Sequence, residues 1–180
     1  RLFPRLSTVQ AGLFITPVLP GGDAIANIEA LSNVSRTLNF RLTVRDNSAY
    51  VPVTPGPPKV GQTAFTDAVV NVTNTSGPMI VTSPNTNVSW PTSSTQTVTW
   101  NVANTTAAPV SCANVKISLS TDGGVTFPTV LVASTPNDGS ESVTMPATSS
   151  TTARIKVEAV GNIFYDISNT NFNITGGTAT

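Results

Sequence analysis

Hydrophobic and polar residues alternate along several short stretches in the second half of the chain. Residues 96–102, 115–120 and 154–159 each alternate with a period of two, which predicts strands with one face on a core and the other in water. Weaker strands are expected at residues 79–82, 129–133, 141–145 and 172–174. Clusters of Pro, Gly, Asn and Asp between these stretches predict turns. No segment carries a convincing helical period with caps.

The first half of the chain is less regular. Its clearest strand covers residues 38–45, and a second is expected at residues 68–72. The first of these strands places four apolar side chains on one face, namely Leu38, Phe40, Leu42 and Val44. The loop between the two strands contains four prolines within residues 50–60. Because proline cannot donate a ladder hydrogen bond, we expect this loop to project rather than pair.

About seven short strands in about 100 residues is the number expected of an immunoglobulin-like or fibronectin-like β-sandwich. The predicted fold class is therefore all-β, with tandem immunoglobulin/fibronectin-like sandwich modules. Residues 78–175 form the complete sandwich in this interpretation. Residues 1–77 hold too few strands, so we expect an incomplete module whose first strands precede residue 1. Gly77-Pro78 marks the boundary between the modules, and residues 176–180 begin a flexible linker.

Charge and hydropathy narrow the possible partners. The chain has 9 basic and 9 acidic residues, so its formal net charge is zero. There is no basic stripe that would attract nucleic acid or an anionic membrane. No apolar run approaches the ~18 residues of a membrane span. We therefore expect neither nucleic acid nor a membrane as a partner.

The chain contains no histidine and a single cysteine, Cys112. Without histidine there can be no Ser-His-Asp triad, Cys–His nucleophile or His-rich zinc site. A lone cysteine forms no internal disulfide and is expected to be a small buried core residue. We predict no catalytic, cofactor-binding or metal-binding residue, and hence no enzyme activity of this chain. The candidates for calcium, Asn137-Asp138 and Asp46-Asn47, lie in loops but lack a known ligand spacing.

Residues 120–127 match the aspartate-box pattern, Ser-x-Asp-x-Gly-x-Thr-aromatic. The carboxylate of such a turn can accept backbone N–H groups, and its glycines adopt positive φ angles. Sialidase propellers carry several copies of the pattern and this chain carries one, so a structural turn is favoured over a glycosidase. A glycosidase needs two carboxylates that face each other across a cleft. Most carboxylates here fall at turns or on outward strand faces, which predicts a solvated surface.

The two tryptophans are expected to have packing roles. Trp100 shares the inward face of its strand with Val98 and Val102, which predicts a core anchor. Trp90, beside Pro91, lies in an irregular stretch and is expected to be a packed edge residue. An exposed carbohydrate platform is the alternative for Trp90.

Two blocks of sequence resemble a known family. Residues 35–47 resemble a segment found just after the catalytic domain of bacterial reprolysin-like zinc metalloproteases, and residues 3–7 resemble the approach to that segment. The second block looks like the next module of the same proteins and comprises residues 81–85, 96–102, 112–115, 120–124, 136–139 and 161–169. The resemblance covers most of the chain. It implies a secreted or cell-surface protein of Gram-negative bacteria, often with a C-terminal sorting domain.

The family's zinc motif, His-Glu-x-x-His with a third His, is absent from this chain. No catalytic residue can be carried over, and zinc is implied only for the catalytic domain of the parent protein. That domain would be a partner within the same chain. We therefore expect a non-catalytic accessory region that acts as a spacer, stabilises its parent enzyme or contacts substrate.

The alternative hypothesis is a module that binds carbohydrate or a cell surface. A structural accessory region predicts polar outer faces without apolar patches and without a pocket. A binding module predicts a row of exposed aromatic side chains or a groove at the loop end of the sandwich, facing a protein or polysaccharide surface.

Overall fold

The structure is a computed structural model that describes residues 5–16, 32–49 and 61–176. The chain divides into two compact units. One unit is formed by Arg1–Leu31 together with Thr75–Thr180, and the other by Ser32–Asn74. Almost all of the regular structure is β, so the predicted all-β class is confirmed.

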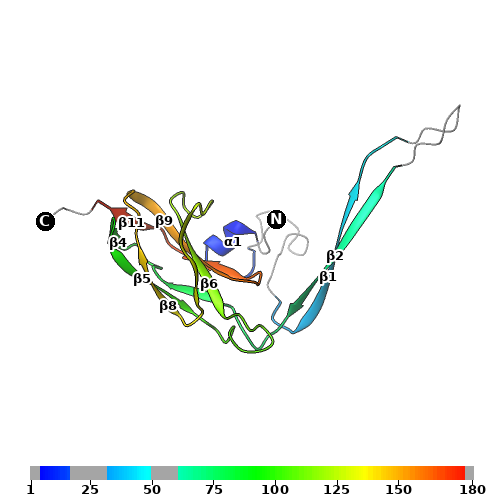
Figure 1. Cartoon of the computed structure of the whole chain (residues 1–180), viewed down its shortest axis with the longest axis horizontal. Helices are drawn as coiled ribbons and strands as arrows, with labels where there is room; N and C mark the ends of the chain where they lie inside the picture. Colours follow the sequence, from blue (N-terminus) through cyan, green and yellow to red (C-terminus); the bar gives the residue numbers. More distant parts are fainter. Residues whose placement is uncertain (1–4, 17–31, 50–60, 177–180) are drawn as a thin grey trace, which may run out of the picture. The chain divides into compact units, whose positions relative to one another are not determined.

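The unit formed by Ser32–Asn74 is a long β-hairpin. Strands β1 (Arg36–Arg45) and β2 (Thr63–Val72) pair antiparallel without a break in register (Figure 1). The first strand was predicted, whereas the second begins five residues earlier than residue 68, where the sequence predicted its start. Asp67 is a poor strand former, but it accepts two hydrogen bonds from Arg41 across the ladder. This cross-strand pair explains why the strand continues through Asp67.

The larger unit holds nine strands and one short helix among its described residues. The helix is α1 (Leu6–Gln10). The strands are β3 (Ile80–Ser83), β4 (Ser89–Pro91), β5 (Thr95–Asn101), β6 (Asn114–Ser120), β7 (Thr129–Pro136), β8 (Ser140–Thr144), β9 (Ser150–Ala159), β10 (Tyr165–Ile167) and β11 (Phe172–Thr175).

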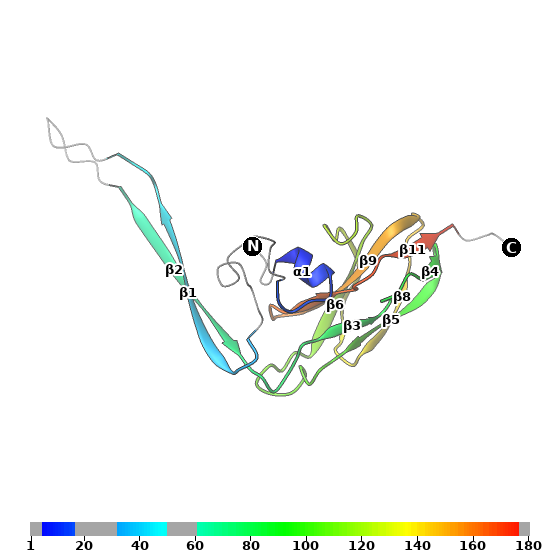
Figure 2. The ribbon, with the colours of Figure 1, turned by 180° about the vertical axis from the view of Figure 1, so that it is seen from behind.

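These strands form two sheets that enclose one core (Figures 1 and 2). The first sheet has the order β3-β5-β8, and the second has the order β4-β11-β9-β6-β7 with β10 beside β9. All pairs are antiparallel except β4 and β11, which run parallel. The core takes Val98 and Trp100 from the first sheet and Ile117, Ile155 and Phe172 from the second. The described part of this unit is therefore a β-sandwich.

All seven strands that the sequence predicted in this unit are present. Three elements were missed: β4, β10 and α1. Each has only three to five residues, which is too short to display a period. The expected polar, water-facing side of β6 was wrong at Ser118 and Ser120, which are both buried. The hydroxyl of Ser120 instead serves the turn that follows the strand.

The division into units differs from the predicted boundary at Gly77-Pro78. Residues 5–16 belong with the sandwich rather than with the hairpin. The reason lies in contacts that join α1 to the second sheet: Arg154 on β9 donates to the carbonyl of Gln10, and the Gln10 amide donates to the carbonyl of Gly123. The predicted proline-rich loop, residues 50–60, lies outside the described residues, as do residues 177–180 of the expected linker.

Candidate functional site

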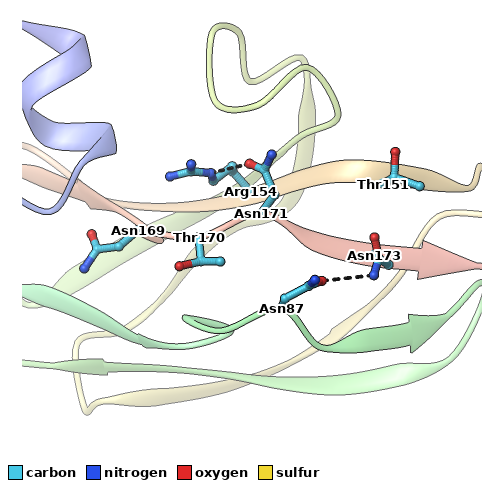
Figure 3. Close-up of a pocket in the computed structure, with 7 residues that line it drawn as sticks. All are labelled: Asn87, Thr151, Arg154, Asn169, Thr170, Asn171 and Asn173. Carbon is cyan, nitrogen blue, oxygen red and sulfur yellow. Dashed lines mark hydrogen bonds between the residues drawn. The ribbon is translucent and has the colours of Figure 1, made fainter.

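The sandwich carries an open, polar hollow on its second sheet. The hollow has a volume of about 410 Å³. Three segments that are distant in sequence form it: the approach to β4, the first half of β9, and the connection from β10 into β11. Its lining consists of amides, hydroxyls and one guanidinium: Asn87, Thr151, Arg154, Asn169, Thr170, Asn171 and Asn173 (Figure 3). No aromatic side chain and no carboxylate lines it.

Arg154 is the only charged residue in the lining. Its Nε donates to Asn171 Oδ1 over 2.6 Å, and its Nη1 donates to the carbonyls of Gln10 and Ser168 over 2.8 Å and 2.6 Å. No described carboxylate pairs with this guanidinium, and no described residue accepts a hydrogen bond from its Nη2. Partial burial lowers the pKa of Arg154, although an arginine stays charged at any physiological pH. The hollow is therefore cationic.

A second pair of side chains lies on the other side of the hollow. Asn173 Nδ2 donates to Asn87 Oδ1 over 3.0 Å (Figure 3). The alternation along β11 explains this placement, because Phe172 and Ile174 are buried in the core and Asn171 and Asn173 therefore point outward. The hydroxyls of Thr151 and Thr170 form no hydrogen bond with the described residues. They remain available to a ligand, as do Asn87 Nδ2, Asn171 Nδ2 and Asn173 Oδ1.

Within its own unit, the hairpin has one apolar face that no residue of the hairpin covers. The in-register pairing places on this face Leu38, Phe40, Leu42, Val44, Ala64, Ala68, Val70 and Val72. Phe40, Leu42 and Val44 are 55%, 64% and 60% exposed. The opposite face carries Arg41, whose guanidinium pairs with Asp67 and lies 4.1 Å from the centre of the Phe65 ring. Within the hairpin unit this face is an exposed apolar patch, unlike the polar outer faces expected of a complete module.

The aspartate box lies in the turn between β6 and β7, and the carboxylate of Asp122 is bonded within this turn. Hydrogen bonds from the side chain of Ser120 and from the hydroxyl and N–H of Thr126 hold the pKa of the Asp122 carboxyl well below its ordinary range. The N–H of Val125 also donates to Asp122, and Gly123 and Gly124 adopt the expected positive φ angles. The carboxylate thus accepts bonds from its own turn, as the structural interpretation predicted.

The calcium candidates have structural partners. The buried side chain of Asn137 accepts a bond from Trp100 Nε1 over 2.8 Å and donates to Thr105 Oγ1 and to the carbonyl of Cys112. Asp46 Oδ1 accepts the N–H groups of Ser48 and Gln62 and so joins the two hairpin strands beyond their last pair. Among the described ranges, no three His, Cys, Asp or Glu side chains cluster in a way that could hold a metal ion.

The predictions for the tryptophans and the cysteine are confirmed. Trp100 is 3% exposed and lies in the core, and Cys112 is buried, which raises the pKa of its thiol. Trp90 is also buried and packs on Phe172 with a centroid distance of 4.9 Å. The carbohydrate platform considered for Trp90 is therefore wrong.

One carboxylate contradicts the expectation of a solvated surface. Asp166 on β10 is 8% exposed, and its Oδ2 accepts the N–H of Val81 on β3 over 2.7 Å. Burial raises the pKa of Asp166 to about 6, although the N–H groups of Val81 and Ile167 oppose the shift. Asp166 therefore joins the two sheets. Two other carboxylates for which a solvated position was expected, Asp23 and Glu29, lie outside the described residues.

Comparison of the chain with protein-family models, with curated proteins and with solved structures found no match in any of the three. No helix in the described part of the chain is long and apolar enough to cross a membrane.

Sequence reasoning did not find the hollow. Its residues come from three segments that only the folded sheet brings together, and Asn and Thr are abundant throughout the chain. The one available signal was the run from Asn169 to Asn173, in which four of five residues are Asn or Thr.

Proposed function

We propose that this chain is the non-catalytic accessory region of a secreted bacterial metalloprotease, with an immunoglobulin-like sandwich as its complete module. It would act as a spacer that stabilises the enzyme or contacts its substrate. The resemblance of residues 35–47 and of the later blocks to reprolysin-like proteases supports the parentage. The proposed location is outside the cell or at its surface.

The order of the strands supports the immunoglobulin-like assignment. In the constant type of immunoglobulin sandwich, the first, second, fourth and fifth strands share one sheet, and the third, sixth and seventh form the other. Here β3, β5 and β8 share one sheet, while β6, β7, β9 and β11 lie in the other. Counted without β4 and β10, six of the seven strands lie in the sheet that this pattern requires, and the fourth, β7, lies in the second sheet instead. The short strand β4 belongs to the second sheet, where it runs parallel to β11.

The uncovered apolar face of the hairpin is the observation that carries the accessory role. A two-stranded hairpin is at best marginally stable in water, and its row of exposed Leu, Phe and Val side chains is a surface that other chains tend to cover. The face offers no charged group except Arg36 at one end. We propose that the preceding, protease-bearing part of the same protein covers it and completes the module to which the hairpin unit, Ser32–Asn74, belongs.

The first test is the coding sequence that precedes residue 1. A His-Glu-x-x-His motif with a third His is expected there, and its absence would overturn the proposed parentage. The second test compares amide hydrogen exchange of residues 36–45 and 63–72 in the chain alone and in the longer protein. The accessory role requires protection that appears only in the longer protein.

A matched pair of variants separates the two faces of the hairpin. Leu42→Ser changes the apolar face and Val69→Ser changes the opposite face, at side chains of similar exposure, 64% and 59%. Protection of the hairpin in the longer protein should fall in Leu42→Ser and persist in Val69→Ser. Equal effects of the two substitutions would show that the apolar face has no covering partner.

A further inference from the structure

We propose that the hollow on the second sheet binds an acidic saccharide, that is, a sugar ring carrying a carboxylate such as a uronate. The ring hydroxyls would bond to the asparagine and threonine side chains, and the carboxylate would lie against Arg154. This site goes beyond the accessory role, and its presence or absence leaves the protease parentage untouched.

The chemistry of the lining indicates a ligand rich in hydroxyl groups. A volume of about 410 Å³ lies within the range of small-molecule sites, but such sites are usually lined by apolar groups. This hollow instead presents four carboxamides and two hydroxyls. A carboxamide offers a donor and an acceptor side by side, which matches two neighbouring hydroxyls of a sugar ring. An apolar ligand would gain nothing from this lining.

The charge of Arg154 indicates that the sugar is acidic. A guanidinium that is partly buried and has no described carboxylate partner gains from an anion, because charge-assisted hydrogen bonds are stronger than neutral ones. Its Nη2 remains available, while Nε and Nη1 hold the group in place through Asn171, Gln10 and Ser168. Three fixed bonds orient the guanidinium before any ligand arrives, which reduces the entropy lost on binding.

A peptide ligand fits the hollow less well. Peptide recognition uses pockets for side chains or an exposed strand edge, and the hollow is open and polar and has no aromatic or aliphatic side chain in its lining. The absence of an aromatic platform also means that the sugar binds through hydrogen bonds alone. The affinity for a single sugar unit is therefore weak, and a polymer gains through repeated contacts.

The test is a titration of the isotope-labelled full chain with trigalacturonate, followed by amide and side-chain NH₂ shifts. We expect saturable shifts that are concentrated on the lining residues of the hollow. Maltotriose, which is neutral, should bind more weakly, and sodium acetate at equal ionic strength should produce no saturable shift. A triglutamate peptide tests whether any acidic chain suffices, and it should not compete.

Three variants and a control assign the effect to the hollow. Thr151→Ala and Asn87→Ala each remove an exposed hydrogen-bonding group and should raise the Kd for trigalacturonate about threefold to tenfold, the range for one lost hydrogen bond. Arg154→Gln should abolish the preference for the acidic over the neutral trisaccharide. Thr97→Ala, on an outward position of β5 in the other sheet, should leave the Kd unchanged.

Because Arg154 also holds α1, its variant is interpreted only together with Thr151→Ala and Asn87→Ala, which break no contact to α1. The proposal is overturned if shifts do not saturate or lie elsewhere. It is overturned equally if acetate or triglutamate reproduces them, or if Thr151→Ala and Asn87→Ala bind as the unchanged chain does.

Discussion

Asp166 shows how one buried side chain can link the two sheets and make stability depend on pH. The carboxylate receives the N–H of Val81 across the sandwich, but water is largely excluded from it. Tyr165, beside it on β10, is the titratable neighbour whose pKa is raised by burial and by the charge of Asp166. No described cation forms an ion pair with Asp166, so the proton is the species that relieves its burial.

We predict that the sandwich is more stable at pH 5 than at pH 7.5. The folded-state pKa of Asp166 is raised from 3.8 to about 6, so the folded state binds the proton more tightly than the unfolded state does. The stabilising contribution is fully present below the unfolded value and is lost as pH rises through about 6. The full contribution, present below the unfolded pKa, is about 3 kcal/mol at most, and about half of it is present at pH 5, since each pKa unit corresponds to about 1.4 kcal/mol.

Urea melts of the full chain and of Asp166→Asn between pH 4 and 8 check this prediction. The neutral amide keeps an acceptor for Val81 but has no charge to desolvate, so its unfolding free energy should vary less with pH. A pH profile that is identical in the two proteins would show that another group is responsible.

Trp100 combines core packing with one polar contact, and two substitutions separate these contributions. Trp100→Ala should cost about 3–5 kcal/mol of unfolding free energy. Trp100→Phe keeps most of the apolar volume but leaves the buried Asn137 Oδ1 without its donor, which should cost about 1–3 kcal/mol. Chemical denaturation measures both.

The control for this series is Trp90→Phe, since Trp90 packs on Phe172 and forms no hydrogen bond through its ring nitrogen with the described residues. It should cost less than Trp100→Phe. If Trp100→Phe were neutral, the bond to Asn137 would contribute nothing to stability.

At the scale of elements, α1 depends on close contact with the sandwich rather than on its own helical stability. It has five residues and no side-chain cap, far below the length at which a helix is stable alone. Gly12, just after it, has φ +67°, and a β-carbon there would lie 2.5 Å from Asn169 Cγ. The chain therefore requires glycine at this position for two separate reasons.

We predict that Gly12→Ala detaches residues 5–16 from the sandwich. The matched control is Gly161→Ala, where φ is +77° and nothing lies within 4 Å of the added carbon. Both variants pay the cost of a left-handed backbone, but only the first meets a neighbour. Amide exchange at residues 8–13 should accelerate in Gly12→Ala alone. Equal acceleration in the control would assign the effect to backbone strain.

The sequence predicted strands well where the alternation of apolar and polar residues was long. It predicted them poorly where a short strand depends on contacts with a segment that is distant in sequence. In β9, Ala153, Ile155 and Val157 are buried as the alternation requires. The three residues of β4 lie beside β11 and depend on that strand, which is about 80 positions later in the chain. The hollow is equally non-local, since Asn87 meets Asn173 only when β4 and β11 pair. Such pairings between distant segments produce no local alternation of apolar and polar residues from which they could be predicted.

At the scale of the whole molecule, the two units should differ in their ability to fold alone. All nine strands of the sandwich lie within residues 75–180, so this fragment should give a well-dispersed amide spectrum. Residues 32–74 contain one hairpin and should give a collapsed spectrum. Separate production of the two fragments tests both statements. A dispersed spectrum from 32–74, or a collapsed one from 75–180, would contradict this division of stability.

The position of β11 between β4 and β9 has a consequence for the order of events during synthesis. Among the described strands, β4 has no neighbour in its sheet other than β11, and β11 is translated after all the others. A nascent chain that has reached residue 170 therefore already contains β4 and β9 but cannot join them. The part of the second sheet that joins β9 to β4 can therefore form only after Phe172–Thr175 have been translated, whereas the pairing of β3, β5 and β8 and that of β6, β7 and β9 do not require these four residues.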